Sequence, residues 1–337
     1  MTDIQRFLPP HHRNLLVLGV THTWAFAAGT LLLALSRHNP HLDADILLLH
    51  DEGLSAQDKD ILSRLGARCH VFSDPCDCLT SELLALYSPL CLAKFLCFEL
   101  LDHYDAIAWL DADCLIQDSI ADLWSFGPLS LAPEDVFFYD DQKARGARIN
   151  GTRPLPGIDP DRPNLNSGVF VLNAQLPNPH ELAEEGRAYL LAHKDVIRFA
   201  DQAAFNVFAH QLMRERPDCF KELPVDFNCH PRNPASLYDP IVHAFGAYKL
   251  WNDGLTAAAF PEWQRDYARW LALGGSPWHG VVENSNYKDM GTFALLTSFY
   301  ETMKKSEESL RILSDKLAQE HRVRARLEEF LQRFSDS

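Results

Sequence analysis

The chain has 337 residues, of which 31 are Lys or Arg and 46 are Asp or Glu, so its formal net charge at pH 7 is −15. With 47% hydrophobic residues, it has the composition of a globular protein that can bury a sizeable core. The acidic balance excludes a protein that binds nucleic acid over a wide basic surface. An acidic ligand would need a metal ion or a focused basic pocket.

Residues 15–36 contain no Lys, Arg, Asp or Glu and are long enough to cross a membrane. The Thr-His-Thr-Trp sequence in their middle and the glycine at position 29 favour another interpretation. We expect a strand over Leu15–Val20, a polar loop, and a helix over Ala27–Arg37, and therefore no transmembrane segment.

Short apolar runs alternate with helical patterns along the next part of the chain. They predict strands over 45–50, 67–72 and 106–116, and helices over 55–65 and 83–101. This alternation predicts an α/β protein with a mostly parallel sheet and helices on both faces. Ligands bind at the carboxyl ends of strands in such sheets, so the residues after Val20 and Leu110 are the first candidates for a site.

Residues 136–165 are rich in Pro, Gly and charge and lack periodicity, which predicts a lid or binding loop. Beyond it we expect a strand over Val169–Asn173 and helices over 180–193 and 201–214. The helical spacing of Trp263, Tyr267 and Trp270 favours core packing over a ligand cage.

Residues 301–337 carry a heptad-like series of apolar residues that Glu320 and Arg324 interrupt. Two interpretations stay open: a helix packed on the body, or a coiled coil or partner helix that would support a homodimer.

We divide the chain into a domain of residues 1–270 and a C-terminal helical extension of residues 271–337.

The strongest chemical feature is Asp111-Ala112-Asp113, at the end of an apolar strand. Carboxylates two residues apart on an extended segment point to one side, and the small Ala112 lets a ligand approach closely. Two oxygen ligands suit Mg²⁺ or Mn²⁺ bridging a diphosphate. Taken alone, the motif fits two turn or capping aspartates equally well.

Five segments resemble, in order, the retaining glycosyltransferases of family 8, which include glycogenin, galactinol synthase and lipooligosaccharide galactosyltransferases. They span about residues 15–252 and are Tyr87–Ile116, Leu165–Val171 (LNSGVFV), Asp201–Asn206 (DQAAFN), Leu223–Asn228 (LPVDFN) and His243–Trp251 (HAFGAYKLW). The resemblance implies the GT-A fold, a single Rossmann-like nucleotide-diphospho-sugar transferase domain. It also implies metal-dependent transfer of a hexose from a UDP-sugar to a hydroxyl of a glycan, lipo-oligosaccharide or protein acceptor, with retention at the anomeric carbon.

Carried over by resemblance, the metal ligands are Asp111, Asp113 and His243, a mixed oxygen and imidazole set that favours Mn²⁺ over Mg²⁺. Lys249 and the backbone near Gly246 would hold the diphosphate of the donor.

Further donor-binding residues follow from the same resemblance. The uracil pocket would consist of Val20, Thr21, Thr23 and Phe26, with Phe26 stacking on the base. Lys94 would reach the donor beside Ala112, and the sugar would be lined by Asp135, Asn166, Asp201 and Gln202. Asp201 and Gln202 are also the candidate catalytic residues. Neither is a well-placed strong nucleophile, which favours front-side attack with the leaving phosphate taking the acceptor proton.

Two residues depart from the family pattern. Leu250 stands where Pro is usual. Trp109 stands where Tyr is common, and we interpret this second difference as a change in core packing.

A haloacid-dehalogenase-type phosphatase also uses Asp-x-Asp after a buried strand, but here Cys114 follows the second Asp. A non-catalytic sugar-nucleotide-binding or scaffold protein of the same fold is the other alternative. The lack of a predicted transmembrane segment leads us to expect a cytoplasmic protein. Glycan synthesis at the inner membrane face, with the protein bound peripherally, is compatible with this expectation.

Overall fold

The computed structural model describes residues 10–74, 77–137, 155–246 and 249–280, together with Leu310, Arg311 and Ser314. The chain divides into two compact units, Met1–Val282 and Glu283–Ser337. Leu310, Arg311 and Ser314 are helical. The rest of the heptad-like series lies outside the described residues, as does most of the predicted lid, over 138–154.

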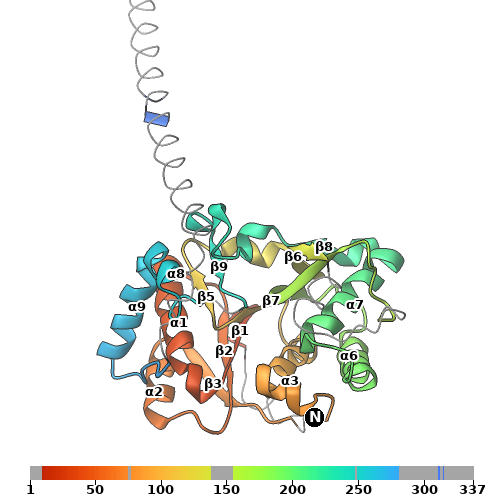
Figure 1. Ribbon diagram of the computed structural model, residues 1–337, viewed down its shortest axis with the longest axis horizontal. Helices are drawn as coiled ribbons and strands as arrows, with labels where there is room; N and C mark the ends of the chain where they lie inside the picture. The colour runs from red at the N-terminus through yellow and green to blue at the C-terminus, as the bar shows by residue number, and fades with distance from the viewer. Residues whose placement is uncertain are drawn as a thin grey trace, which may run out of the picture. The chain divides into compact units, whose positions relative to one another are not determined.

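The first unit is built on a seven-stranded sheet with the strand order β3-β2-β1-β4-β7-β6-β8 (Figure 1). The strands are β1 (Asn14–Val20), β2 (Asp45–His50), β3 (Ala67–Val71), β4 (Ala106–Asp111), β6 (Leu129–Phe137), β7 (Pro163–Asn173) and β8 (Phe220–Glu222). The first four strands run parallel, while β7 is antiparallel to both β4 and β6. The predicted, mostly parallel sheet is confirmed.

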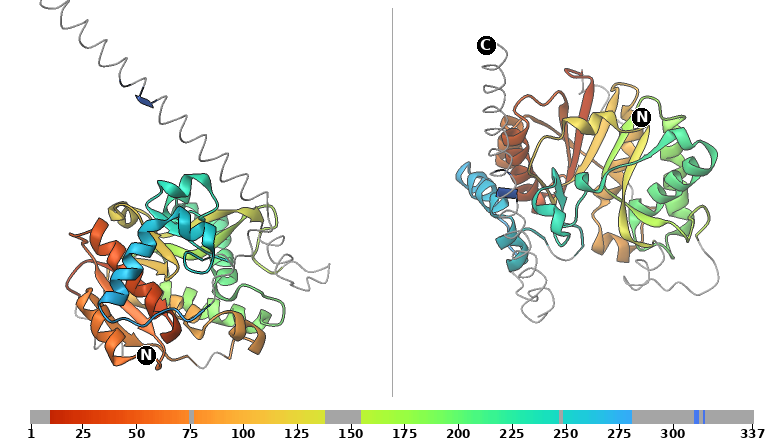
Figure 2. Two further views of the ribbon diagram at one scale, coloured as in Figure 1. Left: turned by 60° about the vertical axis from the view of Figure 1, so that its left-hand side comes forward. Right: turned by 90° about the horizontal axis from the view of Figure 1, so that it is seen from above.

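Helices cover both faces of this sheet, so its strands are apolar on both sides. Leu15 and Val17 of β1 belong to one core cluster with residues of α6 (Pro179–His193) and α7 (Ala200–Glu215). Leu16 and Leu18 belong to a second cluster with residues of α1 (Ala25–His38) and α9 (Pro261–Ala272). Figures 1 and 2 show these two helix pairs on opposite sides of the sheet.

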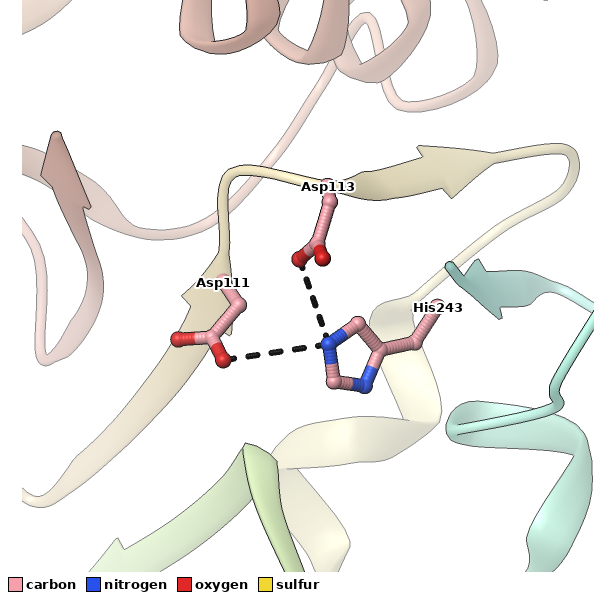
Figure 3. A group of neighbouring side chains, drawn as sticks. All are labelled: Asp111, Asp113 and His243. Carbon is pink, nitrogen blue, oxygen red and sulfur yellow. Dashed lines mark ion pairs between the residues drawn. The ribbon is translucent and has the colours of Figure 1, made fainter. Parts of the chain in front are cut away.

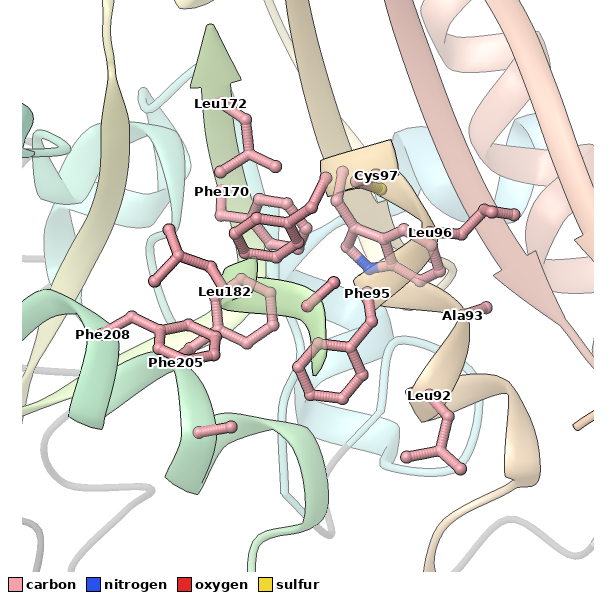
Figure 4. Close-up of a cluster of buried hydrophobic side chains, with 14 of the residues drawn as sticks. Leu92, Ala93, Phe95, Leu96, Cys97, Phe170, Leu172, Leu182, Phe205 and Phe208 are labelled. Atoms are coloured by element: carbon pink, nitrogen blue, oxygen red, sulfur yellow. The ribbon is translucent and has the colours of Figure 1, made fainter. Parts of the chain in front are cut away.

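Aromatic side chains fill much of both clusters. Phe95, Phe170, Phe205 and Phe208 pack together between the sheet and α7 (Figure 4). On the other face, the tryptophans at 263 and 270 are buried on α9, and the ring at 267 stacks on that of 263, 5.2 Å away. The prediction that this aromatic series packs in the core is confirmed.

The apolar stretch 15–36 forms β1, a short 3-10 helix η2 (His22–Trp24) and α1, as predicted. No helix among the described residues combines the length and apolarity needed to cross a membrane.

The single helix predicted over Leu83–Leu101 is wrong. This segment forms α3 (Ser81–Leu86), the 3-10 helix η3 (Pro89–Phe95) and α4 (Leu96–Leu100). Pro89 explains the break, because a proline lacks an N–H and disfavours helical geometry at the preceding residue. Ser88 is extended, and its Oγ accepts a bond from the backbone N–H of Leu90 at 3.1 Å, so it caps the new helix.

The strand predicted over 106–116 is also divided. β4 ends at Asp111, and after a turn the chain continues as β5 (Cys114–Ile116) in a second sheet. There β5 pairs antiparallel with β9 (Ile241–His243), with Cys114 opposite His243. β7 begins six residues before the predicted strand, at Pro163, so the Asn-Ser-Gly motif lies within it.

The remaining elements connect these parts: α2 (Ala56–Arg64), η4 (Ala121–Ser125), η5 (Pro217–Cys219), η6 (Val225–Phe227), η7 (Pro234–Leu237) and α8 (Gly254–Ala259). The boundary expected at residue 270 falls within α9. Beyond it, the Ser276 hydroxyl bonds Asp58 Oδ2 at 2.6 Å, and Ser276 belongs to the first unit.

Candidate functional site

Three distant parts of the chain meet at the carboxyl end of β4. Leu110 pairs with Val169 of the antiparallel β7, which places Gly168 and Ser167 beside Asp111. The pairing of β5 with β9 brings His243 next to the turn that carries Asp113. The convergence therefore depends on strand pairing rather than on the spacing of the two aspartates along one strand.

Asp111, Asp113 and His243 form a compact group of potential metal ligands (Figure 3). His243 Nε2 lies 3.2 Å from Asp113 Oδ1 and 3.7 Å from Asp111 Oδ2, and one ligand atom from each residue lies within 4.8 Å of the others. His243 Nδ1 contacts Asn228 Oδ1 at 2.8 Å, which leaves Nε2 for a cation. Two carboxylates and an imidazole nitrogen therefore fit a divalent metal ion.

Lys249 places a positive charge beside this group. Its Nζ bonds Asp113 Oδ2 and the carbonyl oxygen of Ala244, the latter at 2.8 Å. Burial would raise the pKa of Asp113, but the neighbouring Lys249 and His243 lower it. Gly246, three residues earlier, has a φ of +81°, which favours glycine there. The resemblance assigns both residues to the diphosphate, and the structure places Lys249 beside the candidate metal ligands.

Lys94 is the second cation of the site, and it is 4% exposed. Its Nζ lies 2.8 Å from Asp201 Oδ2, 3.2 Å from Asp111 Oδ1 and 3.4 Å from Ser167 Oγ. Burial disfavours its charged form, yet Asp111 and Asp201 raise the pKa of Lys94. This ammonium group therefore lies in the interior between two carboxylates.

Trp109 has a larger role than the core packing inferred from the sequence. Its indole Nε1–H donates to Asp111 Oδ1 at 2.7 Å, and its ring stacks on Phe170 with 6.2 Å between centroids. Burial raises the pKa of Asp111, and the charges of Lys94 and His243 oppose this effect. The i, i+2 relation of Trp109 and Asp111 on β4 was a sequence signal for this contact.

Three of the four expected sugar-lining residues have side-chain partners in the structure: Asn166 and Gln202 contact Glu134, and Asp201 contacts Ser167. Asn166 Nδ2 donates to Glu134 Oε1 at 2.6 Å, and Gln202 Nε2 donates to the same oxygen at 3.4 Å. Asp201 lies in the first turn of α7 and bonds Ser167 Oγ at 2.6 Å, so it is not the residue that caps the helix. Asp135 is on β6, but its side chain lies outside the described part.

Glu134 was missed by the sequence reasoning. It stands next to Asp135 at the edge of the predicted lid, and no sequence signal separated the two acids. Ala112 is buried in the turn between β4 and β5.

Phe26 is a correction to the expected uracil pocket. Its side chain is 1% exposed, and its ring packs edge-on against Trp251 at 5.1 Å and Tyr267 at 5.9 Å. A ring enclosed on all sides by core residues has no free face for a base. Trp24 is half-buried, meets Trp251 edge-on at 5.0 Å, and has Lys249 Nζ 5.6 Å from its ring.

The other residues of the expected uracil pocket lie at the carboxyl end of β1. Val20 is buried at the end of the strand, and the hydroxyls of Thr21, the residue before η2, and Thr23 within η2 lie 2.9 Å apart. The last residue of η2 is Trp24, which is partly exposed and has Lys249 Nζ near its ring. A tryptophan directly after the first strand was the sequence signal for it.

The chain is similar to solved glycosyltransferase structures. It matches the galactosyltransferase LgtC in complex with donor and acceptor sugar analogues with a TM-score of 0.58 at 16% identity, covering 77% of this chain and 99% of LgtC. It matches the bifunctional glycosyltransferase WbbM with a TM-score of 0.57 at 15% identity, covering 78% of this chain and 51% of WbbM. A search of curated proteins found no match. These TM-scores show a shared fold, the GT-A fold expected from the sequence.

The family described as "Glycosyl transferase family 8" matches residues 15–254, which is more than half of the chain. This match contains all three candidate metal ligands, and it excludes the haloacid-dehalogenase alternative. With its GT-A fold and the Asp-Asp-His group at the end of β4, the chain belongs to glycosyl transferase family 8 and is a glycosyltransferase.

Proposed function

We propose that this enzyme transfers a hexose from a UDP-sugar to an acceptor hydroxyl, with retention at the anomeric carbon and in dependence on a divalent metal, Mn²⁺ in preference to Mg²⁺. The observation that carries the proposal is the grouping of Asp111, Asp113 and His243 with Lys249 at the carboxyl end of β4. In open α/β sheets this end of the strands is where nucleotides bind.

The departing UDP carries the largest charge in the reaction, and the site supports it with positive charge. A cation held by Asp111, Asp113 and His243 would act as a Lewis acid on the diphosphate oxygens. Lys249 is close enough to Asp113 to bond the same diphosphate, which would hold the leaving group in place. The half-buried Trp24 offers an aromatic face for the uracil base, in place of Phe26.

The surroundings of Asp201 favour front-side attack over a covalent intermediate. Its Oδ2 already accepts bonds from Lys94 and Ser167, and these contacts stabilise the carboxylate as an anion and weaken it as a nucleophile. Gln202 has a neutral amide whose Nε2 is directed to Glu134. Asp201 and Gln202 would therefore bind and orient the sugar, and the leaving phosphate would take the proton of the acceptor hydroxyl.

The anomeric outcome is testable separately. NMR of the donor and the product should show the same anomeric configuration. Mass spectrometry should detect no sugar attached to Asp201 or Gln202 during turnover. An inverted product would contradict retention, and a trapped covalent sugar would contradict front-side attack.

Metal dependence follows from the acidic character of the chain, whose net charge of −15 repels UDP. Titration calorimetry of UDP should show much tighter binding with Mn²⁺ than without it. Asp113→Ala should abolish this gain, while Asp122→Ala, which removes an exposed aspartate on η4, should preserve it. Equal binding with and without Mn²⁺ would contradict the proposal.

Release of UDP from a panel of UDP-hexoses identifies the donor, because slow donor hydrolysis requires no known acceptor. We further propose a cytoplasmic location, peripheral at the inner membrane face, and a C-terminal extension that mediates dimerisation or binds a partner helix. Cross-linking of the full chain tests the dimer.

A further inference from the structure

A continuous row of side-chain hydrogen bonds leads away from the back of His243. His243 Nδ1 contacts Asn228 Oδ1 at 2.8 Å, and Asn228 Nδ2 donates to Asn166 Oδ1 at 3.1 Å. Asn166 Nδ2 then donates to Glu134 Oε1 at 2.6 Å. His243, Asn228 and Asn166 are at most 5% exposed, so water does not compete for these bonds.

Two fixed groups give this row a single direction. The backbone N–H of Gly168 can only donate, and it meets Asn166 Oδ1 at 2.8 Å. An ionised Glu134 can only accept, so the amide nitrogen of Asn166 must face it. Both constraints orient Asn166 in the same way.

The orientation of Asn166 determines the rest of the row. Because Asn166 presents its oxygen, Asn228 must present its amide nitrogen to it, and the oxygen of Asn228 then faces His243. An oxygen acceptor at this position requires a proton on His243 Nδ1. The nitrogen left for a metal ion is therefore Nε2, the atom that faces Asp111 and Asp113.

We propose that Asn228 is a positioning residue that holds His243 in the Nδ1–H tautomer, with Asn166, Gly168 and Glu134 setting the direction of the bond. This inference rests on the proposed function in one respect, namely that His243 Nε2 ligates a metal. It assigns a role to Asn228, the asparagine that ends the Leu-Pro-Val-Asp-Phe-Asn segment and was not among the predicted site residues.

The tautomer can be measured without metal by ¹⁵N NMR of the full chain labelled at histidine, with His243→Gln to assign the signal. At alkaline pH, where imidazoles are neutral, the parent should show a protonated Nδ1. Asn228→Ala should give a mixture of tautomers. Asn228→Asp retains an oxygen acceptor and should keep the Nδ1 proton, and it remains informative if the alanine variant does not fold. An unprotonated Nδ1 in the parent, or an Nδ1 protonated to the same extent in Asn228→Ala as in the parent, would overturn the proposal.

The consequence for metal binding is measured with Mn²⁺ alone by calorimetry. Asn228→Ala should weaken Mn²⁺ binding about 10- to 100-fold, as is typical when the hydrogen-bond partner of a metal-binding histidine is lost. Asn233→Ala is the matched control, because the Asn233 side chain caps η7 through the N–H of Ala235 and has no part in the row. Parent-like Mn²⁺ affinity in Asn228→Ala would contradict the positioning role. If the parent binds no Mn²⁺ while its tautomer is as expected, the proposed function fails and the role of Asn228 in setting the tautomer stands.

Discussion

Asp111 is held by partners on two sides before any ligand is considered. Trp109 and Lys94 contact its Oδ1 at 2.7 and 3.2 Å, and Oδ2 lies toward His243. Fixed partners of this kind set the direction of a carboxylate and so reduce the reorganisation needed when a cation binds. At the scale of single residues, the site depends on groups that do not themselves ligate a metal.

Trp109→Phe removes one of these partners and keeps an aromatic ring in the core. Loss of a hydrogen bond to a charged group should weaken Mn²⁺ binding about 10-fold. Calorimetry with Mn²⁺ measures the effect. Trp263→Phe is the matched control, because the buried indole nitrogen of Trp263 has no hydrogen-bond partner among the described residues. Equal losses in both variants would indicate a packing effect only.

Lys94→Met removes a buried cation and leaves Asp111 and Asp201 without it. Because an uncompensated charge in the interior is costly, the free energy of unfolding should fall by about 3–5 kcal/mol. Urea denaturation measures this change. Lys221→Met, which removes an exposed lysine on β8, should change stability by less than about 1 kcal/mol. A stable Lys94→Met variant would show that the carboxylates are neutralised in another way.

At the scale of elements, two strand pairings assemble the site: β5 pairs with β9, and β7 pairs antiparallel with β4. Gly168 on β7 lies directly against the imidazole of His243 on β9. A Cβ added at Gly168 would lie 1.9 Å from His243 Cε1, far closer than atoms can approach. The glycine of the Asn-Ser-Gly motif therefore makes room for the imidazole, and its N–H anchors Asn166.

Gly168→Ala should displace His243 and sharply weaken Mn²⁺ binding. Calorimetry and urea denaturation together separate local displacement from general unfolding. Gly53→Ala is the comparison, since its Cβ would meet only the half-exposed His22 ring, at 2.5 Å, which can move away. If Gly168→Ala bound Mn²⁺ like the parent, the close packing between β7 and β9 would not control the site.

At the scale of the whole molecule, two cores on opposite faces of one sheet provide the stability, and several titratable groups are enclosed in them. His210 on α7 is 1% exposed and accepts a bond from the backbone N–H of Asp159 at 3.0 Å. Burial lowers the pKa of His210 to about 4 from its ordinary value of 6.5. The folded chain therefore excludes a proton that the unfolded chain binds.

The pH dependence of stability follows from this difference. Between pH 6.5 and about 4 the unfolded state binds more protons at His210 than the folded state, so the free energy of unfolding falls as the pH falls. His210→Gln keeps an acceptor for Asp159 and does not titrate, so it should lose less stability over this interval. Urea denaturation at several pH values tests this, with His41→Gln, at an exposed position, as the control. Parallel pH profiles for His210→Gln and the parent would contradict it.

The sequence by itself determined the class of sheet and the chemistry of its edge. Continuous apolar runs such as that in β1 are stable only when both faces are covered, which indicates a parallel sheet with helices on both sides. Asp111, Asp113, His243 and Lys249 were identified by the resemblance of their segments to family 8, because the Asp-x-Asp motif taken alone fitted capping aspartates equally well.

Only the tertiary structure decided which neighbours act on these groups. Trp109, Glu134 and Asn228 lie on different elements, and their contacts depend on strand register and on turns that no local pattern specifies. Burial separated Phe26 from Trp24, although both are aromatic residues close to the end of β1. Residue types and local periodicity thus fixed the kind of chemistry, while long-range packing decided which side chains orient it.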